Sequence, residues 1–112
     1  MIIITLDCDG TVWTGCPAGI ITEDMIRAWL HKGYLVIMIS DSPCCKDFAK
    51  TGAGYMPTPW GMRHETISRI MAQHQDAVIY YIDDVPDHVE ACQKSIDPKR
   101  CIFLSPQSAY KI

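Results

Sequence analysis

Four short apolar runs divide the chain and alternate with segments in which apolar residues recur at helical spacing. The runs cover residues 2–6, 34–39, 78–82 and 101–104, and most of their residues are large and apolar. Continuous apolar runs of this length are typical of strands that are buried on both faces of a sheet. Their alternation with amphipathic helices predicts an α/β fold, in which helices cover both faces of a mainly parallel sheet.

Local start and stop signals place helices between these strands. Thr22 can cap a helix that has an acidic first turn and ends before Gly33. A second helix is expected to end near Gly52, and residues 51–57 form either a short edge strand or a loop. A capping residue or a proline marks the start of the second, third and fourth helices, at Ser42-Pro43, Thr58-Pro59 and Val85-Pro86.

Length and charge restrict the classes of protein that the chain can belong to. It has 112 residues and a formal net charge of −3. A chain of this length buries enough surface for one hydrophobic core, so residues 1–112 are expected to form a single domain. No run of five like charges occurs, which argues against a nucleic-acid partner. The longest apolar run is too short to span a bilayer and no basic leader precedes it, so we expect a cytoplasmic protein with no membrane partner.

The six cysteines do not indicate a disulfide framework or a zinc site. Such a framework is typical of small secreted chains, and the cysteine spacings lack the paired pattern of zinc ligands. We therefore expect reduced thiols, several of them buried as small apolar residues. The cysteines are at positions 8, 16, 44, 45, 92 and 101.

Three strands are each followed by a polar cluster that contains an acid. Asp7 and Asp9 follow the first, Ser40-Asp41 the second, and Asp83-Asp84 the third. Ligands of open parallel sheets bind beyond the carboxyl ends of the strands, so these clusters are expected to meet at one site. Carboxylates that are close together repel unless a cation lies between them, and an all-oxygen site suits Mg²⁺.

The stretch Asp7-Cys8-Asp9-Gly10-Thr11-Val12-Trp13 resembles the first motif of the haloacid dehalogenase-like hydrolase superfamily. Residues 36–40 resemble its second motif, an apolar strand that ends in a phosphate-binding Ser or Thr. Residues 80–84 resemble its fourth motif, an acidic strand end that holds the metal. The resemblance implies a three-layer Rossmann-like fold and a Mg²⁺-dependent phosphatase that hydrolyses phosphomonoesters.

The resemblance also implies a role for each matching residue. Asp7 would be the nucleophile that forms an aspartyl-phosphate, and Asp9 the general acid and then the general base. Ser40 would donate a hydrogen bond to the phosphoryl group. Mg²⁺ would be held by Asp7, Asp9 and the fourth motif, with Asp84 preferred over Asp83 as the direct ligand. Substrate contacts would come from Gly10, Thr11 and Trp13 of the first motif and from Asp41 directly after the second.

The third motif departs from the family pattern, because no lysine precedes the fourth motif at the expected place. Arg63 is the nearest cation and is our preferred substitute, and Lys46 and Lys50 are the alternatives. Without a cation near Asp7, the chain would be a non-catalytic phosphate-binding or regulatory module. A polynucleotide 3′-phosphatase is a further alternative, although the acidic balance argues against tight nucleic-acid binding.

Aromatic and histidine residues add secondary expectations. Residues 12–19 would form a flap over the site, and Trp13 would either stack on the leaving group or pack the flap onto the sheet. Trp29 and Trp60 are expected to pack in the core or between helices. None of the four histidines is expected to bind metal, and His88 draws attention because it lies next to the fourth motif.

The spacing of the motifs leaves no room for a cap domain. Residues 10–39 are occupied by flap, helix and strand, and residues 41–82 by two helices and an edge strand or loop. We therefore expect a capless enzyme with an open site. Its phosphorylated substrate would be a small molecule or the terminal phosphate of a larger one, or a second copy of the chain would act as a lid in a homo-oligomer.

Overall fold

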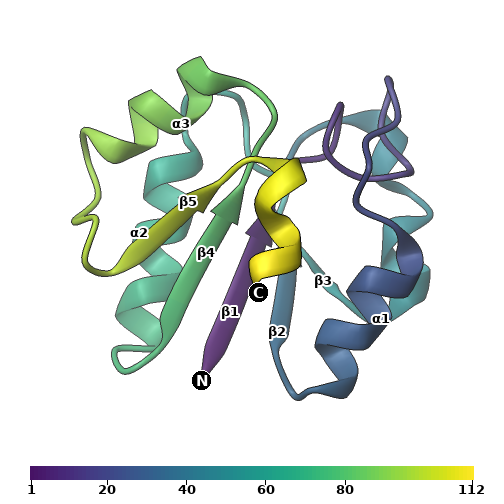
Figure 1. Cartoon of the computed structure of the whole chain (residues 1–112). Coiled ribbons are helices and arrows are strands. Elements are labelled where there is room, and N and C mark those ends of the chain that lie inside the picture. The colour runs from purple at the N-terminus through teal and green to yellow at the C-terminus, as the bar shows by residue number, and fades with distance from the viewer.

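The computed structural model describes all 112 residues and contains one sheet of five parallel strands (Figure 1). The order across the sheet is β3-β2-β1-β4-β5. This confirms the α/β class and the four strands that the apolar runs predict. It also decides between strand and loop for residues 51–57, because a short strand pairs with β2 at the edge. The strands are β1 (Ile2–Leu6), β2 (Leu35–Met38), β3 (Gly54–Tyr55), β4 (Val78–Ile82) and β5 (Cys101–Leu104).

Three α-helices and three 3-10 helices connect or follow the strands. The α-helices are α1 (Glu23–His31), α2 (Arg63–Gln73) and α3 (Pro86–Gln93). The 3-10 helices are η1 (Pro43–Cys45), η2 (Phe48–Thr51) and η3 (Pro106–Lys111). None of these helices has the length and apolar composition that crossing a bilayer requires.

Two clusters of buried side chains lie on opposite faces of the sheet. In β1, Ile4 and Leu6 belong to one cluster and Ile3 belongs to the other, as the alternation of side chains along a strand requires. The first cluster includes residues of α1, η2 and η3, and the second includes residues of α2 and α3. Helical elements therefore pack on both faces, with η3 crossing one of them next to β1 in Figure 1.

Three of the predicted helix starts are confirmed and one is wrong. Thr22 caps α1 and accepts a hydrogen bond from the Met25 N–H, and Pro86 opens α3. Ser42 caps η1, which begins at Pro43, although residues 43–51 form two 3-10 helices instead of one helix. The Thr58 hydroxyl contacts the Met56 carbonyl and the Thr66 hydroxyl, so it is not free to cap, and α2 begins only at Arg63.

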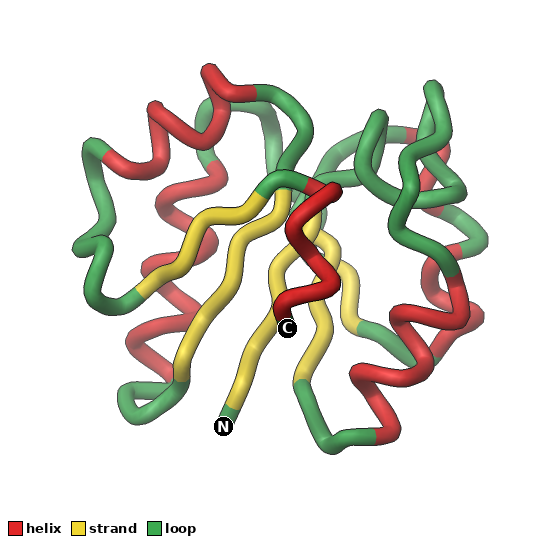
Figure 2. Tube along the Cα trace, in the orientation of Figure 1, coloured by secondary structure: helices red, strands yellow, loops and turns green.

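The strand order brings the predicted polar clusters to one place. The chain moves outward from β1 to β3 on one side and then crosses over to β4 and β5 on the other, so the order reverses at the pair β1 and β4. Ligands of doubly wound sheets bind outside the carboxyl ends of the strands at such a reversal. Figure 2 shows the loops that follow the strands gathered at that end of the sheet.

The expectation that all cysteines are reduced is wrong for two of them. Cys16 and Cys44 form a disulfide that joins the loop after β1 to η1. The spacing along the chain gave no sign of this pair, because folding alone brings the two loops together. The other four cysteines are free and buried, as expected. Burial raises the pKa of Cys92 to about 11 and that of Cys101 to about 12, so neither thiol is reactive near neutral pH.

The three tryptophans have different surroundings. Trp29 is 5% exposed and belongs to the buried cluster beneath α1, which confirms its predicted packing role. Trp13 packs against the same cluster, with its ring 6.0 Å from that of Phe48. The prediction for Trp60 is wrong, because this side chain is 66% exposed.

The disulfide makes two outcomes testable. The unfolded, unreduced chain should show four reactive thiols and the reduced chain six, as counted with a thiol reagent. Replacing both bridging cysteines, as Cys16→Ser with Cys44→Ser, should lower the free energy of unfolding by about 3 kcal/mol, because a closed loop restricts the unfolded chain. Reductant should destabilise the parent and not the double variant. Six reactive thiols without reductant would contradict the bridge.

Candidate functional site

The loop after β1 presents two carboxylates at the centre of the sheet's carboxyl edge. Asp7 is 4% exposed and directly follows the strand, and Asp9 is partly exposed. Gly10 turns the chain with φ 74°, a conformation that favours glycine. A Cβ at this position would also collide with the carboxylate of Asp84. Glycine at position 10 therefore allows the first and fourth acidic segments to approach each other.

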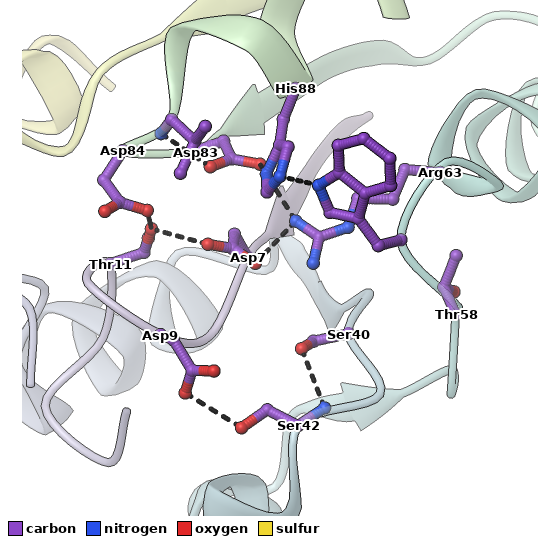
Figure 3. A network of polar contacts seen from close by, with 12 residues as sticks. Asp7, Asp9, Thr11, Ser40, Ser42, Thr58, Arg63, Asp83, Asp84 and His88 are labelled. Carbon is purple, nitrogen blue, oxygen red and sulfur yellow. Dashed lines mark hydrogen bonds and ion pairs between the residues drawn. The ribbon is translucent and has the colours of Figure 1, made fainter. Parts of the chain in front are cut away.

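Arg63, the first residue of α2, reaches into the same site. Its Nη1 lies 2.5 Å from Asp7 Oδ1 and 2.9 Å from Asp83 Oδ2, and the side chain is 6% exposed (Figure 3). Arg63 is thus the cation that faces Asp7, as preferred from the sequence. The alternatives do not reach it, since Lys46 is exposed and Lys50 forms an exposed ion pair with Asp47.

Asp83 anchors this arrangement through both of its oxygens. Oδ1 accepts a hydrogen bond from the Val85 N–H at 2.9 Å. Oδ2 is contacted by Arg63 Nη1, by the Tyr81 hydroxyl and by His88 Nδ1, the last at 2.9 Å. A carboxylate with this many partners is held in one orientation and has little capacity left for a further ligand.

Burial and charge perturb the ionisation of these groups. Burial, and then the charge of Asp83, raise the pKa of Asp7 from its ordinary 3.8 to about 6, and Arg63 opposes this rise. Burial alone would lower the pKa of Arg63, but Tyr81 and the carboxylates outweigh it and raise that pKa above its ordinary value. Burial and Asp83 also raise the pKa of Tyr81, so its hydroxyl remains a hydrogen-bond donor. One cation thus faces two buried acids, which leaves an excess of negative charge.

Asp9 is oriented by the loops on either side of it. Its Oδ1 accepts hydrogen bonds from the Ser42 hydroxyl at 2.8 Å and from the Cys16 N–H at 2.9 Å. Its Oδ2 has no protein partner and is therefore free to donate a proton to a ligand or to accept one from it. Because Cys16 belongs to the disulfide, the bridge ties together the loops that supply these two donors.

The serine after β2 is also in place. Ser40 is 2% exposed, and its hydroxyl oxygen accepts a hydrogen bond from the Ser42 N–H at 3.1 Å. Since that bond uses a lone pair of the oxygen, the hydroxyl hydrogen of Ser40 remains free to donate to a ligand. Asp41 is exposed at the rim of the same site.

The donor atoms include groups that could hold a metal ion. Ligand atoms of Asp7, Asp83 and His88 lie within 4.8 Å of one another. A second arrangement involves Asp84, because the Thr11 hydroxyl lies 3.3 Å from Asp7 Oδ2 and 3.2 Å from Asp84 Oδ1. This hydroxyl has one proton and can satisfy only one of the two carboxylates at a time. The uncompensated charge and the unsatisfied carboxylate oxygen fit a bound cation.

A cavity of about 420 Å³ joins most of these groups. It does not include three of the predicted substrate-binding residues: Gly10 and Thr11 lie in the loop beside it, and Trp13 packs against Phe48. It does include five residues that the motifs did not assign to the site, namely Ser42, Pro43, Trp60, Val85 and His88. Its lining consists of Asp7, Asp9, Ser40, Asp41, Ser42, Pro43, Trp60, Arg63, Val85 and His88.

Tyr81 is a further residue that the motifs did not assign to the site. It precedes Asp83 by two positions in an extended segment, so both side chains point to the same side of the sheet. That alternation was a signal by which the sequence could have revealed the pair. No comparable signal existed for Trp60 and His88, which are 28 residues apart and meet only in the folded chain.

Comparisons with known proteins add no family assignment. The chain matches no protein-family model, no curated protein and no solved structure. Function is therefore inferred from the residues and their geometry.

The raised pKa of Asp7 predicts a pH-dependent stability in the absence of divalent cations. The folded state binds the proton of the Asp7 carboxyl more tightly than the unfolded state does, so this proton adds to the free energy of unfolding. The added stability is fully present below pH 3.8 and is lost as the pH rises through about 6. One pKa unit corresponds to about 1.4 kcal/mol. Between pH 4 and pH 7.5, the free energy of unfolding of Asp7→Asn should therefore rise by about 2 to 3 kcal/mol relative to that of the parent. Urea unfolding measures this difference. The exposed control Asp76→Asn should show a constant difference from the parent, and a constant difference for Asp7→Asn would contradict the perturbed pKa.

Proposed function

We propose that the protein is a Mg²⁺-dependent hydrolase of phosphomonoesters that forms an aspartyl-phosphate on Asp7. The carrying observation is the contact of buried Asp7 with Arg63 at the reversal of strand order, in a cavity that also contains Asp9 and Ser40. This arrangement supports assignment to the haloacid dehalogenase-like hydrolases, with a three-layer Rossmann-like fold, because Asp7, Asp9 and Ser40 line one cavity together with Arg63.

In the first step, a carboxylate oxygen of Asp7 attacks phosphorus and the bond from phosphorus to the leaving oxygen breaks. Arg63 contacts its protein partners through Nη1, whereas its Nη2 makes no hydrogen bond within the protein. The guanidinium therefore has donor capacity left for the phosphoryl oxygens, to which it is well matched. The free hydroxyl hydrogen of Ser40 supplies a further donor from the other side of the cavity.

Asp9 carries the proton in both steps. Its Oδ2 is free of protein partners, so in its protonated form it donates to the departing oxygen. In the second step the same oxygen takes a proton from water as that water attacks the aspartyl-phosphate, which releases phosphate and restores Asp7. The Ser42 and Cys16 donors keep the carboxylate from rotating between these steps.

Asp7 and Asp84 are the residues we expect to hold Mg²⁺, with Asp9 and Asp83 beside them. Asp83 already uses both oxygens, whereas Asp84 is exposed and shares only the Thr11 hydroxyl. When bound, Mg²⁺ would supply positive charge that offsets the negative charge on the phosphoryl oxygens. The segments between the strands form only loops and helices of the same domain. No segment is left over for a cap domain, which supports an open site.

Hydrolysis of p-nitrophenyl phosphate tests this function. The parent should release nitrophenol with Mg²⁺ and lose that activity with a chelator. Asp7→Asn should abolish turnover because it removes the nucleophile. Asp9→Asn should lower the rate by about 10²-fold or more because it removes the acid and base.

The matched control is Asp76→Asn, which changes an exposed acid outside the site and should retain the parental rate. Turnover that survives in Asp7→Asn would refute the aspartyl-phosphate. Phosphate binding by the parent without hydrolysis of any phosphomonoester would instead indicate the non-catalytic module.

Arg63 has a separate expected effect. Arg63→Ala should lower kcat/KM by about 10²-fold, because a preoriented donor to the transition state is lost. Arg63→Lys keeps a charge without the planar fork and should recover part of that loss. An unchanged rate in Arg63→Ala, measured on protein shown to be folded by circular dichroism, would exclude this role.

A further inference from the structure

Trp60 stands at the wall of the cavity with most of its surface in solvent. It lies between β3 and α2, is 66% exposed, and lines the same cavity as Asp7 and Asp9. Covering a large aromatic side chain with a ligand is energetically favourable, because apolar surface is removed from water. An exposed aromatic side chain beside a polar site is therefore a candidate ligand contact.

The indole is held in place through its edge. Its N–H donates a hydrogen bond to His88 Nε2, and the two rings meet edge to face with centroids 5.3 Å apart. His88 Nδ1 is in turn 2.9 Å from Asp83 Oδ2, the oxygen that also contacts Arg63. Because the N–H lies on the indole edge, this anchoring leaves the ring faces uncovered.

The anchoring also settles what His88 does in this arrangement. Nε2 accepts the hydrogen bond of the indole N–H, so the imidazole carries a proton on Nδ1 and donates it in a hydrogen bond to Asp83. A chain of contacts thus connects Trp60 to the carboxylate that orients Arg63. The exposed ring and the phosphate-binding cation are therefore fixed relative to each other.

The charges in the cavity restrict which ligand can lie against Trp60. Arg63 is the only permanently charged cation among the lining residues, which also include the three acids Asp7, Asp9 and Asp41. One phosphoryl group can be accommodated by Arg63 and a metal ion. A leaving group with further negative charges would meet unpaired carboxylates, so a neutral leaving group is favoured.

We propose that Trp60 stacks on a planar aromatic ring in the leaving group, so that the substrates are monophosphates whose alcohol carries a neutral ring. This inference rests on the proposed phosphatase function and names its substrate class. Two sources share the required chemistry: a nucleoside monophosphate, through its base, and a benzyl or phenyl phosphate.

Two substrate pairs isolate the ring from the reacting bond. Adenosine 5′-monophosphate and ribose 5-phosphate have the same leaving oxygen and differ by the base. Benzyl phosphate and ethyl phosphate both release a primary alcohol and differ by the ring. For each pair, the ratio of kcat/KM with the ring to kcat/KM without it measures recognition of the ring.

We expect a ratio of about ten or more in at least one pair, since stacking of a base on an aromatic side chain has about this effect. Trp60→Ala should bring that ratio down about tenfold, and Trp60→Phe should keep most of it because a ring face remains. The control Tyr110→Ala removes an aromatic side chain that is 78% exposed and does not line the cavity, and it should leave the ratio unchanged.

Each outcome bears on the inference in a distinct way. A high ratio for the nucleotide pair alone identifies the base as the ring, and one for the benzyl pair alone identifies a simple aryl group. Ratios near one in the parent, or a ratio that Trp60→Ala leaves unchanged while all rates fall, would overturn the stacking role and leave the phosphatase function standing. No hydrolysis of any of the four substrates or of p-nitrophenyl phosphate would overturn both, whereas hydrolysis of p-nitrophenyl phosphate alone would overturn only the proposed substrate class.

Discussion

The contact of Arg63 with Asp7 and Asp83 is the interaction on which the site depends. It joins the start of α2 to the ends of the two strands between which the sheet order reverses. Two buried carboxylates at this position would repel each other strongly without it. The cation lessens that repulsion without removing it. Burial, and then the charge of Asp83, raise the pKa of Asp7. The remaining negative charge would favour a bound cation.

The acids of the site divide into those that are fully hydrogen-bonded and those that keep a free oxygen. Asp83 is saturated by its neighbours and orients Arg63 and His88. Asp9 has one oxygen occupied and one free, which suits a group that gives and takes a proton. The same residue type thus serves different purposes, because the number of donors around each carboxylate differs.

Much of the fold could be predicted from local pattern. The runs at residues 2–6, 78–82 and 101–104 coincide with strands, and Thr22 caps α1 as its type suggests. Predictions were wrong where a local signal met a tertiary competitor. Thr58 looks like a helix cap, yet its hydroxyl is taken by Met56 and Thr66, so α2 starts later.

The sequence by itself determined the α/β class, the acids at the strand ends and the turn at Gly10 after Asp9. Strand periodicity and turn chemistry act over a few residues, so a local pattern is enough to reveal them. Only the tertiary structure decided the contact of Arg63 with Asp7, the bridge from Cys16 to Cys44 and the exposure of Trp60 beside His88. Each of these joins or exposes segments that are far apart along the chain. Their proximity follows from the order of the strands and the packing of helices on the sheet, which no local pattern encodes.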